Sequence, residues 1–346
     1  MPFSTVHCAA DPEIYRHTIR PAGAEFLVLG RGRFAGNVTK IDLHRLWIQR
    51  IEENLPRTWS IPTTAARSAI WFLTASGAAA YANGVEVRGD HIGLLPPATT
   101  TFNRSAGPLQ AASMSLPIED MAKLGIALVG RDLTLRRGTV SLPASSEPLE
   151  RLRRLHEAAG RIAATAPEII ASSDAALGLE QSLLDAMFDC LAQGRVQEDA
   201  SSRGRHNAIV KRFRALAEEN PEEPLYLADV CAAVGVNKRT LHLCCQEQLG
   251  VSPKRYLMLR RMHLARQALV AGTADASSVT EIATRYGFWE LGRFAVHYRA
   301  VFGESPSATL RRSRLDRAPG AGKPASSRLA TPEMAGSARS KLASFA

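Results

Sequence analysis

The sequence predicts an α+β protein of two domains, an N-terminal β-barrel with flanking helices and an all-α C-terminal domain. Three observations support this prediction. Short β-branched and aromatic segments separated by turn signals fill the first third of the chain. Helical spacing of apolar residues replaces them after Pro117. Excess positive charge is confined to the last third, which indicates a separate domain with its own partner.

Strands are expected over residues 1 to about 116. Segments 25–30, 38–49 and 69–74 are short and are bounded by Gly, Pro or Asn. Asn83 and Gly84 lie between two strand-like runs and predict a tight hairpin turn. Another strand-like run ends at Pro96 and Pro97. Many short strands with close turns favour a small barrel or a sandwich.

Helical spacing follows in segments 118–128, 149–163 and 174–194. The last segment carries one continuous apolar stripe, made of Leu183, Leu184, Met187, Phe188 and Leu191. An amphipathic face does not name its partner. The stripe is therefore expected either to cover the chain's own barrel or to form a dimerisation helix.

Composition and patterning divide the chain into four parts. Residues 1–195 form the first domain, and the polar, unpatterned residues 196–206 are expected to be a linker. Residues 207–312 are nearly all helical in pattern. Residues 313–346 are rich in Ala, Ser, Gly and Pro, and we expect a disordered basic tail there because such a segment buries no core.

The net charge of +10 is distributed unevenly. Residues 238–312 hold 12 Lys and Arg against 5 Asp and Glu, and residues 313–346 hold 6 against 2. Residues 1–237 therefore carry a net charge of −1. A basic domain joined to a near-neutral one suggests a polyanionic partner for the basic part.

Two segments of the last third repeat the same pattern. Each has a short helix with a small residue, Cys231 or Ala283, four positions before a glycine, Gly235 or Gly287. A tight turn and a longer helix follow, and each unit ends in Gly-x-Ser-Pro. A small residue lets two helices approach closely, and the glycine permits the sharp turn between them. The pattern predicts two helix-turn-helix units.

Helix caps are also predicted in both units. Ser278 and Glu281 have capping-box spacing, and Asn237 is placed as the N-cap of the first unit's second helix. A helix of roughly 18 residues (about 27 Å) joins the two units. A rod of that length suits two presented helices in successive major-groove segments about 34 Å apart.

This arrangement resembles the AraC/XylS family of transcription regulators over roughly residues 208–312. The segment RYGFWELGRFAVHYRAVFGESP, which ends at Pro306, carries most of the resemblance. The N-terminal half resembles, more weakly, the cupin-like sensor domain of such regulators. The resemblance implies sequence-specific DNA binding, usually activation, and often control by a small effector.

The faces of the two presented helices give the candidate DNA contacts. In the first helix Leu241, Cys244, Cys245 and Leu249 are expected to face the core, and in the second Phe294, Tyr298 and Phe302. The remaining faces are expected to meet DNA through Lys238, Arg239, His242, Leu243, Gln246, Gly292, Arg293, Val296 and Arg299. Arg293 suits bidentate pairing with guanine, whereas Arg299 and Lys238 suit phosphate contacts. We expect the connecting helix to direct part of its charge to phosphates through Arg255, Arg260, Arg261 and Arg266.

The N-terminal half shows no catalytic signature. It contains no H-x-H, G-x-S-x-G, phosphate loop or G-x-G-x-x-G, so we expect no enzyme activity, no metal and no cofactor. An effector pocket is one hypothesis for His44, Trp47, Trp59 and Trp71, and barrel packing is the other. The five cysteines form no C-x-x-C pair and are expected to be reduced.

These expectations combine into one function. The sequence predicts a cytoplasmic, homodimeric DNA-binding regulator, without a membrane segment or a secretory signal, that acts on double-stranded DNA and RNA polymerase. A metal-free enzyme that processes a small molecule and carries a DNA-binding tail is one alternative. A non-specific architectural DNA-binding protein is the other. The effector, the target promoters and the choice between activation and repression stay open.

Overall fold

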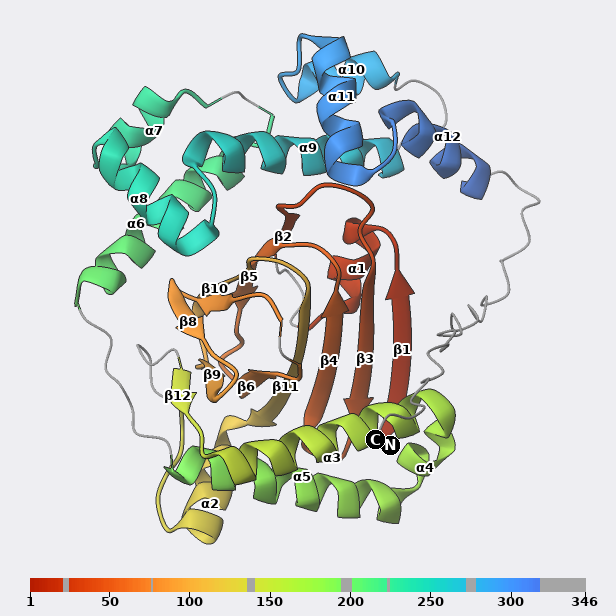
Figure 1. Ribbon diagram of the computed structural model, residues 1–346, viewed down its shortest axis with the longest axis vertical. Coiled ribbons are helices and arrows are strands. Elements are labelled where there is room, and N and C mark those ends of the chain that lie inside the picture. Colours follow the sequence, from red (N-terminus) through yellow and green to blue (C-terminus); the bar gives the residue numbers. More distant parts are fainter. Residues whose placement is uncertain are drawn as a thin grey trace, which may run out of the picture.

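The computed structural model describes residues 1–20, 25–75, 77–135, 141–193, 201–222, 225–271 and 278–317 (Figure 1). The strands are β1 (Phe3–Ala9), β2 (Glu25–Val28), β3 (Gly36–Asp42), β4 (Trp47–Glu53), β5 (Arg57–Pro62), β6 (Arg67–Leu73), β7 (Ala80–Ala82), β8 (Val85–Val87), β9 (His91–Leu95), β10 (Thr100–Ser105), β11 (Leu109–Pro117) and β12 (Ser141–Pro143). The helices are α1 (Pro12–Thr18), α2 (Ile118–Val129), α3 (Ser146–Thr165), α4 (Pro167–Ala171), α5 (Ser173–Gln193), α6 (Ser201–Glu219), α7 (Leu227–Val234), α8 (Lys238–Leu249), α9 (Pro253–Ala271), α10 (Val279–Arg285), α11 (Leu291–Phe302) and α12 (Pro306–Arg317).

Two antiparallel sheets build the N-terminal domain. The larger has the strand order β1-β3-β4-β11-β6-β9-β12, and the smaller has the order β2-β5-β10-β7-β8. Asn83 and Gly84 form the β7–β8 turn with positive φ, as their sequence predicts. Segment 38–49 is two strands rather than one, because a turn closed by Leu43 N–H and the Leu46 carbonyl divides it.

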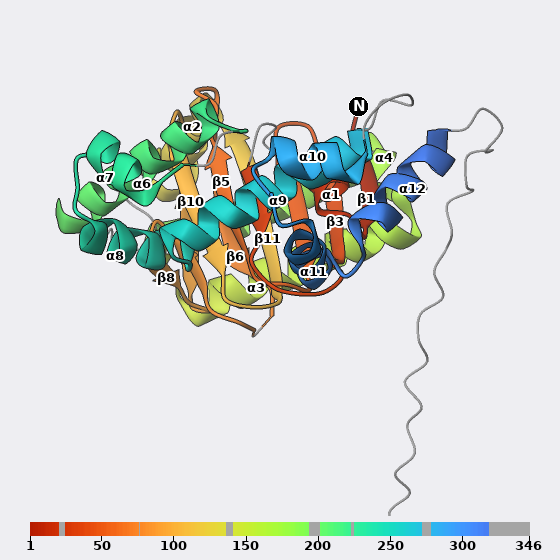
Figure 2. The same cartoon turned by 90° about the horizontal axis from the view of Figure 1, so that it is seen from above.

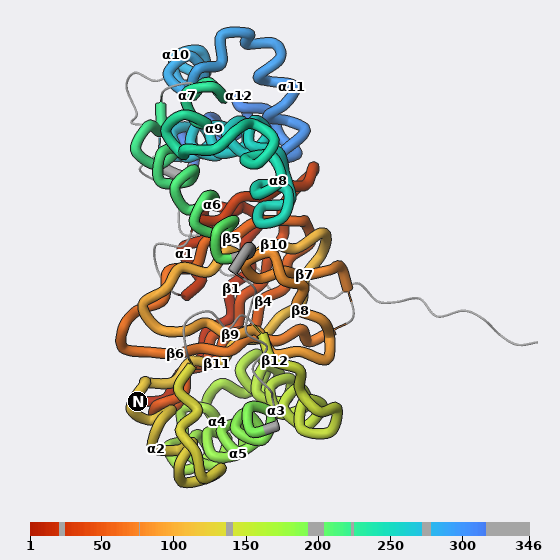
Figure 3. The backbone as a smooth tube through the Cα atoms, turned by 90° about the vertical axis from the view of Figure 1, so that its left-hand side faces the viewer, coloured from red at the N-terminus to blue at the C-terminus, as the bar shows by residue number. Residues whose placement is uncertain are grey.

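A period of two along β11 separates the faces of the larger sheet. Met114 and Leu116 are buried in the cluster that α2, α3 and α5 cover. Ser113 and Ser115 lie on the opposite face, because successive side chains of a strand alternate. Figure 3 shows the resulting layers, with α2 to α5 below the sheets and α6 to α12 above them.

The apolar stripe of α5 covers the chain's own sheet. Leu183, Leu184 and Met187 are fully buried, and Phe188 and Leu191 are nearly so, in one cluster with α3 and the larger sheet. This confirms the first of the two interpretations. The interpretation of the stripe as a dimerisation face is wrong, because its side chains are already buried within the chain.

The boundaries of the C-terminal domain differ from those predicted. Helix α6 begins at Ser201, so residues 201–206 of the expected linker are helical, and His206 bonds Glu247 at 2.7 Å. Residues 313–317 of the expected disordered tail complete α12, and Ser313 donates to the Val270 carbonyl. The rest of the expected linker, residues 196–200, and the rest of the expected tail, residues 318–346, lie outside the described residues. Residues 194–195 lie outside them as well.

Carboxylates of the N-terminal domain hold the helices of the C-terminal domain. Glu25 on β2 pairs with Arg214 of α6 and with Arg260 of α9, and it accepts a hydrogen bond from the Tyr256 hydroxyl at 2.9 Å. Leu27 of the same strand joins the apolar core of the C-terminal domain. The two domains are therefore packed together rather than merely tethered.

A second cluster lies on α1. Asp11 pairs with Arg266 of α9 at 2.6 Å, and Arg266 also pairs with Glu304 at 2.9 Å. Glu13 accepts from Gln267 at 2.9 Å and lies 3.4 Å from the ring of His263. We call these contacts of Asp11, Glu13 and Glu25 the domain interface.

The predicted phosphate role of the arginines on α9 is wrong in this structure. Arg260 and Arg266 pair with carboxylates of the domain interface. Arg255 donates to the Leu29 carbonyl at 3.1 Å, and Arg261 donates to the carbonyls of Tyr286 and Gly287. All four guanidinium groups contact protein acceptors, and Arg255 is the one of the four that is exposed.

Replacing Leu184 with alanine should lower the free energy of unfolding by about 2–5 kcal/mol without changing the oligomeric state. The side chain is fully buried within the chain, so its loss leaves a cavity in the core of the N-terminal domain. Chemical denaturation and sedimentation velocity measure the two quantities. Leu177→Ala is the matched control, because Leu177 lies on the same helix and is 54% exposed. Dissociation of a dimer by Leu184→Ala, with unchanged stability, would contradict the assignment.

Replacing Glu25 with glutamine should loosen the two domains and lower the unfolding free energy by about 2 kcal/mol or more, because two partly buried arginines lose their counter-ion. Limited proteolysis and thermal unfolding are the measurements. Glu86→Gln is the control, since Glu86 is an exposed carboxylate on β8. Equal behaviour of the two variants would show that the ionic contacts do not hold the interface.

Candidate nucleic-acid interface

The first helix-turn-helix unit consists of α7 and α8. Gly235 has φ of +75°, a left-handed conformation that glycine adopts without strain. The Val236 N–H reaches the Cys231 carbonyl at 3.0 Å and closes the end of α7. Asn237 then caps α8, because its side chain accepts from Thr240 N–H at 2.8 Å.

The second unit, α10 and α11, repeats this geometry. Gly287 has φ of +73°, and the Phe288 N–H reaches the Ala283 carbonyl at 2.9 Å. Ser278 and Glu281 form the predicted capping box in both directions, at 3.1 and 2.7 Å. Both predicted turns and both predicted caps are confirmed.

The inner faces of the presented helices are buried as predicted. Leu241, Cys244 and Cys245 are fully buried in α8, and Leu249 is 1% exposed. Phe294, Tyr298 and Phe302 pack into the core from α11 with ring centroids 4.6–5.6 Å apart. The Tyr298 hydroxyl contacts Arg266 and Thr309, which ties α11 to α9 and α12.

The candidate DNA contacts lie on the opposite, solvent-facing sides. Leu243 is 56% exposed and Val296 67% exposed. The other candidates are exposed as well, and they are Lys238, Arg239, His242, Gln246, Gly292, Arg293 and Arg299. The structure therefore brings five of the nine residues together on α8 and four on α11.

Each presented helix is docked at its C-terminal end and free at its N-terminal end. In α8 the Gln248 amide donates to the Asn83 carbonyl at 3.1 Å, and Arg104 donates to the Glu247 carbonyl at 3.2 Å. In α11 the Ala300 carbonyl accepts from Gly32 N–H at 3.0 Å. Recognition helices contact base edges with their N-terminal residues. Docking to the N-terminal domain therefore leaves the reading ends open.

The two units lie at opposite ends of α9 (Figure 2). In that view α8 lies below α7, and α11 lies below α10, so both presented helices are on the same side of the domain. Helix α9 has 19 residues, which corresponds to about 28 Å. The predicted connecting helix is thereby confirmed.

Arg293 has a partner on the surface. Its guanidinium lies 3.1 Å from Glu290, and the two side chains are 67% and 69% exposed. Exposed pairs of this kind contribute little, typically about 0–1 kcal/mol. The pair therefore holds the Arg293 guanidinium only weakly. Arg293 is able to exchange Glu290 for another hydrogen-bond acceptor, such as a guanine edge.

Trp289 was not among the predicted contacts. It follows Phe288 in the turn before α11 and is 73% exposed, whereas Phe288 packs against the core. The sequence gives two adjacent aromatic residues and does not distinguish them. Only the path of the turn places Trp289 beside the reading end of α11.

The four residues considered for an effector pocket do not all lie in one place. Trp59 and Trp71 line a cavity inside the barrel, and Trp47 lines its outer part. His44 lies elsewhere, with its ring nitrogen 3.2 Å from the Ser173 carbonyl. The prediction for His44 is therefore wrong, and the other three share one cavity.

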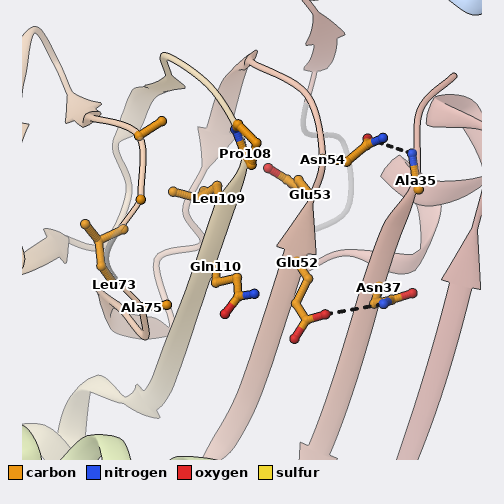
Figure 4. A pocket seen from close by; sticks show the side chains of 12 residues that line it. Ala35, Asn37, Glu52, Glu53, Asn54, Leu73, Ala75, Pro108, Leu109 and Gln110 are labelled. Atoms are coloured by element: carbon orange, nitrogen blue, oxygen red, sulfur yellow. Dashed lines mark hydrogen bonds between the residues drawn. The ribbon is translucent and has the colours of Figure 1, made fainter. Parts of the chain in front are cut away.

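A separate cleft of about 380 Å³ opens beside β3, β4 and β11 (Figure 4). Its polar groups already have partners within the protein. Asn37 bonds Glu52, Asn54 bonds the Ala35 N–H, and Glu53 pairs with Arg57. This cleft therefore offers few free groups to a ligand.

Two chemical features are absent from the described ranges. No group of three or more His, Cys, Asp or Glu lies in an arrangement that could hold a metal ion there. None of the helices in those ranges combines the length and the hydropathy needed to cross a membrane. All five cysteines are free thiols.

Replacing Gly287 with alanine should lower the stability of the second unit by about 1–2 kcal/mol, because the left-handed backbone strains any Cβ. Gly292→Ala is the control. Gly292 lies within α11, and a Cβ there meets nothing within 4 Å, so alanine should be neutral or stabilising by up to about 1 kcal/mol. Chemical denaturation separates the two, and equal losses would contradict the turn assignment.

Comparisons with known proteins agree with this geometry. A family model described as a helix-turn-helix domain matches residues 230–312. The chain is 37% identical over 147 residues to the probable thc operon regulatory protein of Rhodococcus erythropolis, covering 40% of this chain and 44% of that protein. It is 35% identical over 120 residues to the XylDLEGF operon transcriptional activator 1 of Pseudomonas putida, covering 35% and 36%. The matched region thus spans less than half of either curated relative.

One solved structure is also similar in sequence. The chain is 34% identical to a probable AraC family transcriptional regulator from Rhodopseudomonas palustris, covering 97% of that chain and 31% of this one, with a TM-score of 0.29. Over its C-terminal third this chain is therefore similar to transcription regulators of operons that carry a helix-turn-helix domain.

Proposed function

We propose that this protein is a sequence-specific DNA-binding regulator that reads two adjacent major-groove segments with each monomer. The observation that carries the proposal is the pair of exposed reading ends on α8 and α11, joined by α9. A rod of about 28 Å between the units is compatible with groove segments about 34 Å apart.

Each reading end offers a different set of contacts. On α11, Arg293 pairs bidentately with guanine, and Val296 contacts a thymine methyl. Gly292 lets the backbone approach the DNA, because it has no side chain. On α8, Arg239, His242, Leu243 and Gln246 meet base edges. Lys238 and Arg299 bind phosphates and set the register.

The N-terminal domain supplies control. Regulators similar to this chain are named as an operon regulatory protein and an operon activator, which supports activation here. We propose that a homodimer bridges two sites and positions RNA polymerase at the promoter in the cytoplasm. A small effector bound by the N-terminal domain then acts on α8 and α11 through the domain interface.

Selection of genomic fragments by the full-length protein, at about 150 mM salt, tests this function. Non-specific binding is suppressed at that salt concentration. The expected result is a shared motif with two contact blocks roughly one helical turn apart. Fragments enriched without any shared motif would instead indicate an architectural protein that binds through phosphates alone.

Replacing Arg293 with alanine should weaken binding by about 1–3 kcal/mol and relax the preference at one base pair. Arg299→Ala is the matched variant on the same helix. It should weaken binding equally for all sequences and reduce the salt slope by about 1. Affinity measurements on the motif and on its single-base variants distinguish the two. Uniform weakening by Arg293→Ala would reduce that residue to a phosphate contact.

A further inference from the structure

The inner face of the barrel carries several polar side chains among its buried apolar ones. Gln49, Ser113 and Trp71 are aligned across β4, β11 and β6, and Trp47 and Ser115 are in the next inward row. The outward neighbours on β11 are Met and Leu. Inner positions of a sheet-on-sheet core are ordinarily apolar. Gln49 and Ser113 therefore place polar groups in an interior that is lined by apolar side chains as well.

These side chains surround a cavity of two adjoining parts. The outer part measures about 310 Å³ and is lined by Trp47, Arg67 and Ser115, among others. The inner part is a narrow extension of about 50 Å³ that reaches Trp59, Trp71 and Asn103. Both parts share Arg20, Gln49, Leu95 and Ser113. The volume lies at the small end of the roughly 300–1,000 Å³ typical of small-molecule sites.

Three polar atoms of the inner part have no hydrogen-bond partner among the described residues. They are the indole Nε1 of Trp59, the indole Nε1 of Trp71 and the Oδ1 of Asn103. The three residues are only 4%, 8% and 5% exposed. Buried polar atoms are nearly always paired. The inner part of the cavity therefore offers two hydrogen-bond donors and one acceptor to a polar ligand.

A glycine fixes the position of one of these donors. A Cβ on Gly93 of β9 would lie 2.1 Å from Trp71 Nε1. The indole therefore lies directly against the backbone of β9, where only a glycine admits it. Gly93 is aligned with Trp71 across the ladder.

The outer part carries a cation, Arg67, that has no carboxylate within ion-pair distance among the described residues. Arg20 pairs with Asp42 and Arg57 pairs with Glu53, but no ion pair to Arg67 is found in the described part of the chain. Arg67 donates instead to Ser115 Oγ and to two backbone carbonyls, and its guanidinium lies 3.7 Å from the Trp47 ring centroid. Burial lowers the pKa of Arg67 to about 10, so it stays cationic at neutral pH.

Asp42 and Asp120 act on Arg67 only from beyond ion-pair distance. A carboxylate in direct contact stabilises such a half-buried cation further. We propose that the barrel cavity binds a small organic carboxylate, with its carboxylate at Arg67 and Ser115 and its apolar body against Leu95 and Trp71. A hydroxyl or carbonyl at the far end of the ligand accepts from the indoles of Trp59 and Trp71. The identification of this ligand as the effector rests on the proposed function, whereas its binding does not.

Titration of the full-length protein with matched compounds tests the site. The probes are phenylacetate, 4-hydroxyphenylacetate and phenylacetamide, which share one body and differ in charge or in the far-end group. Tryptophan fluorescence and isothermal titration calorimetry report binding. Phenylacetate should bind at least about 10-fold more tightly than phenylacetamide. The 4-hydroxy compound should bind more tightly again, by about 3–10-fold.

Variants assign the contacts. Arg67→Gln should remove the preference for carboxylate over amide, and Arg67→Lys should retain most of it. Trp59→Phe should remove the gain from the 4-hydroxy group. Arg161→Gln is the control, because Arg161 is a 66% exposed arginine on α3. Circular dichroism and the thermal midpoint confirm that each variant is folded, and Arg67→Lys keeps the test decisive where Arg67→Gln is unfolded.

Two results would overturn the proposal. One is binding of phenylacetamide as tight as that of phenylacetate, or no binding of any probe. The other is an unchanged charge preference in folded Arg67→Gln. Selection of DNA fragments by the same variants, without probe, separates this proposal from the function. If probe binding is lost and DNA selection is intact, only the carboxylate site is rejected. If the probe binds and no DNA is selected, the proposed DNA-binding function is rejected.

Discussion

The packing of the two domains depends on the pairing of arginines on α6 and α9 with carboxylates of the N-terminal domain. Arg266 is 3% exposed and Arg214 is 4% exposed. A charge at that depth is tolerated only when it is paired and hydrogen-bonded. Asp11 and Glu25 supply the pairing from α1 and β2, which lie on the side of the barrel that faces α9. The basic helix thereby becomes a structural axis rather than a DNA-binding surface.

This axis explains why the reading ends of α8 and α11 are free. Each presented helix contacts the N-terminal domain through its C-terminal turn, where Gln248 and Ala300 make backbone contacts. The N-terminal turns carry Arg239 and Arg293, which are exposed. Fixing one end of a helix limits its orientation while leaving the other end open to a duplex. The positions of both helices therefore depend on the same domain.

The barrel cavity and the domain interface lie on the two sides of the same structural elements. Trp59 lines the inner cavity, and its ring lies 5.6 Å from Phe26 of β2. Phe26 is the neighbour of Glu25, which holds Arg214 and Arg260. Arg57 connects to the opposite side of the same elements, since Glu53 pairs with it and accepts from Tyr15 of α1. The carboxylates that hold α9 are thus carried by elements that also enclose the barrel.

The sequence by itself determined the features that depend on local geometry. The turn glycines, the Asn237 cap, the capping box of Ser278 and the buried faces of α8 and α11 follow from φ preferences and from a period of 3.6 residues. The tertiary structure decided the features that join distant segments. Arg266 meets Asp11 across 255 positions and Arg260 meets Glu25 across 235, so a helical pattern alone made these arginines appear free for DNA. The stripe on α5, the start of α6 and the polar interior of the barrel belong to the same class, because burial and pairing are set by which elements meet and not by the order of residues within one of them.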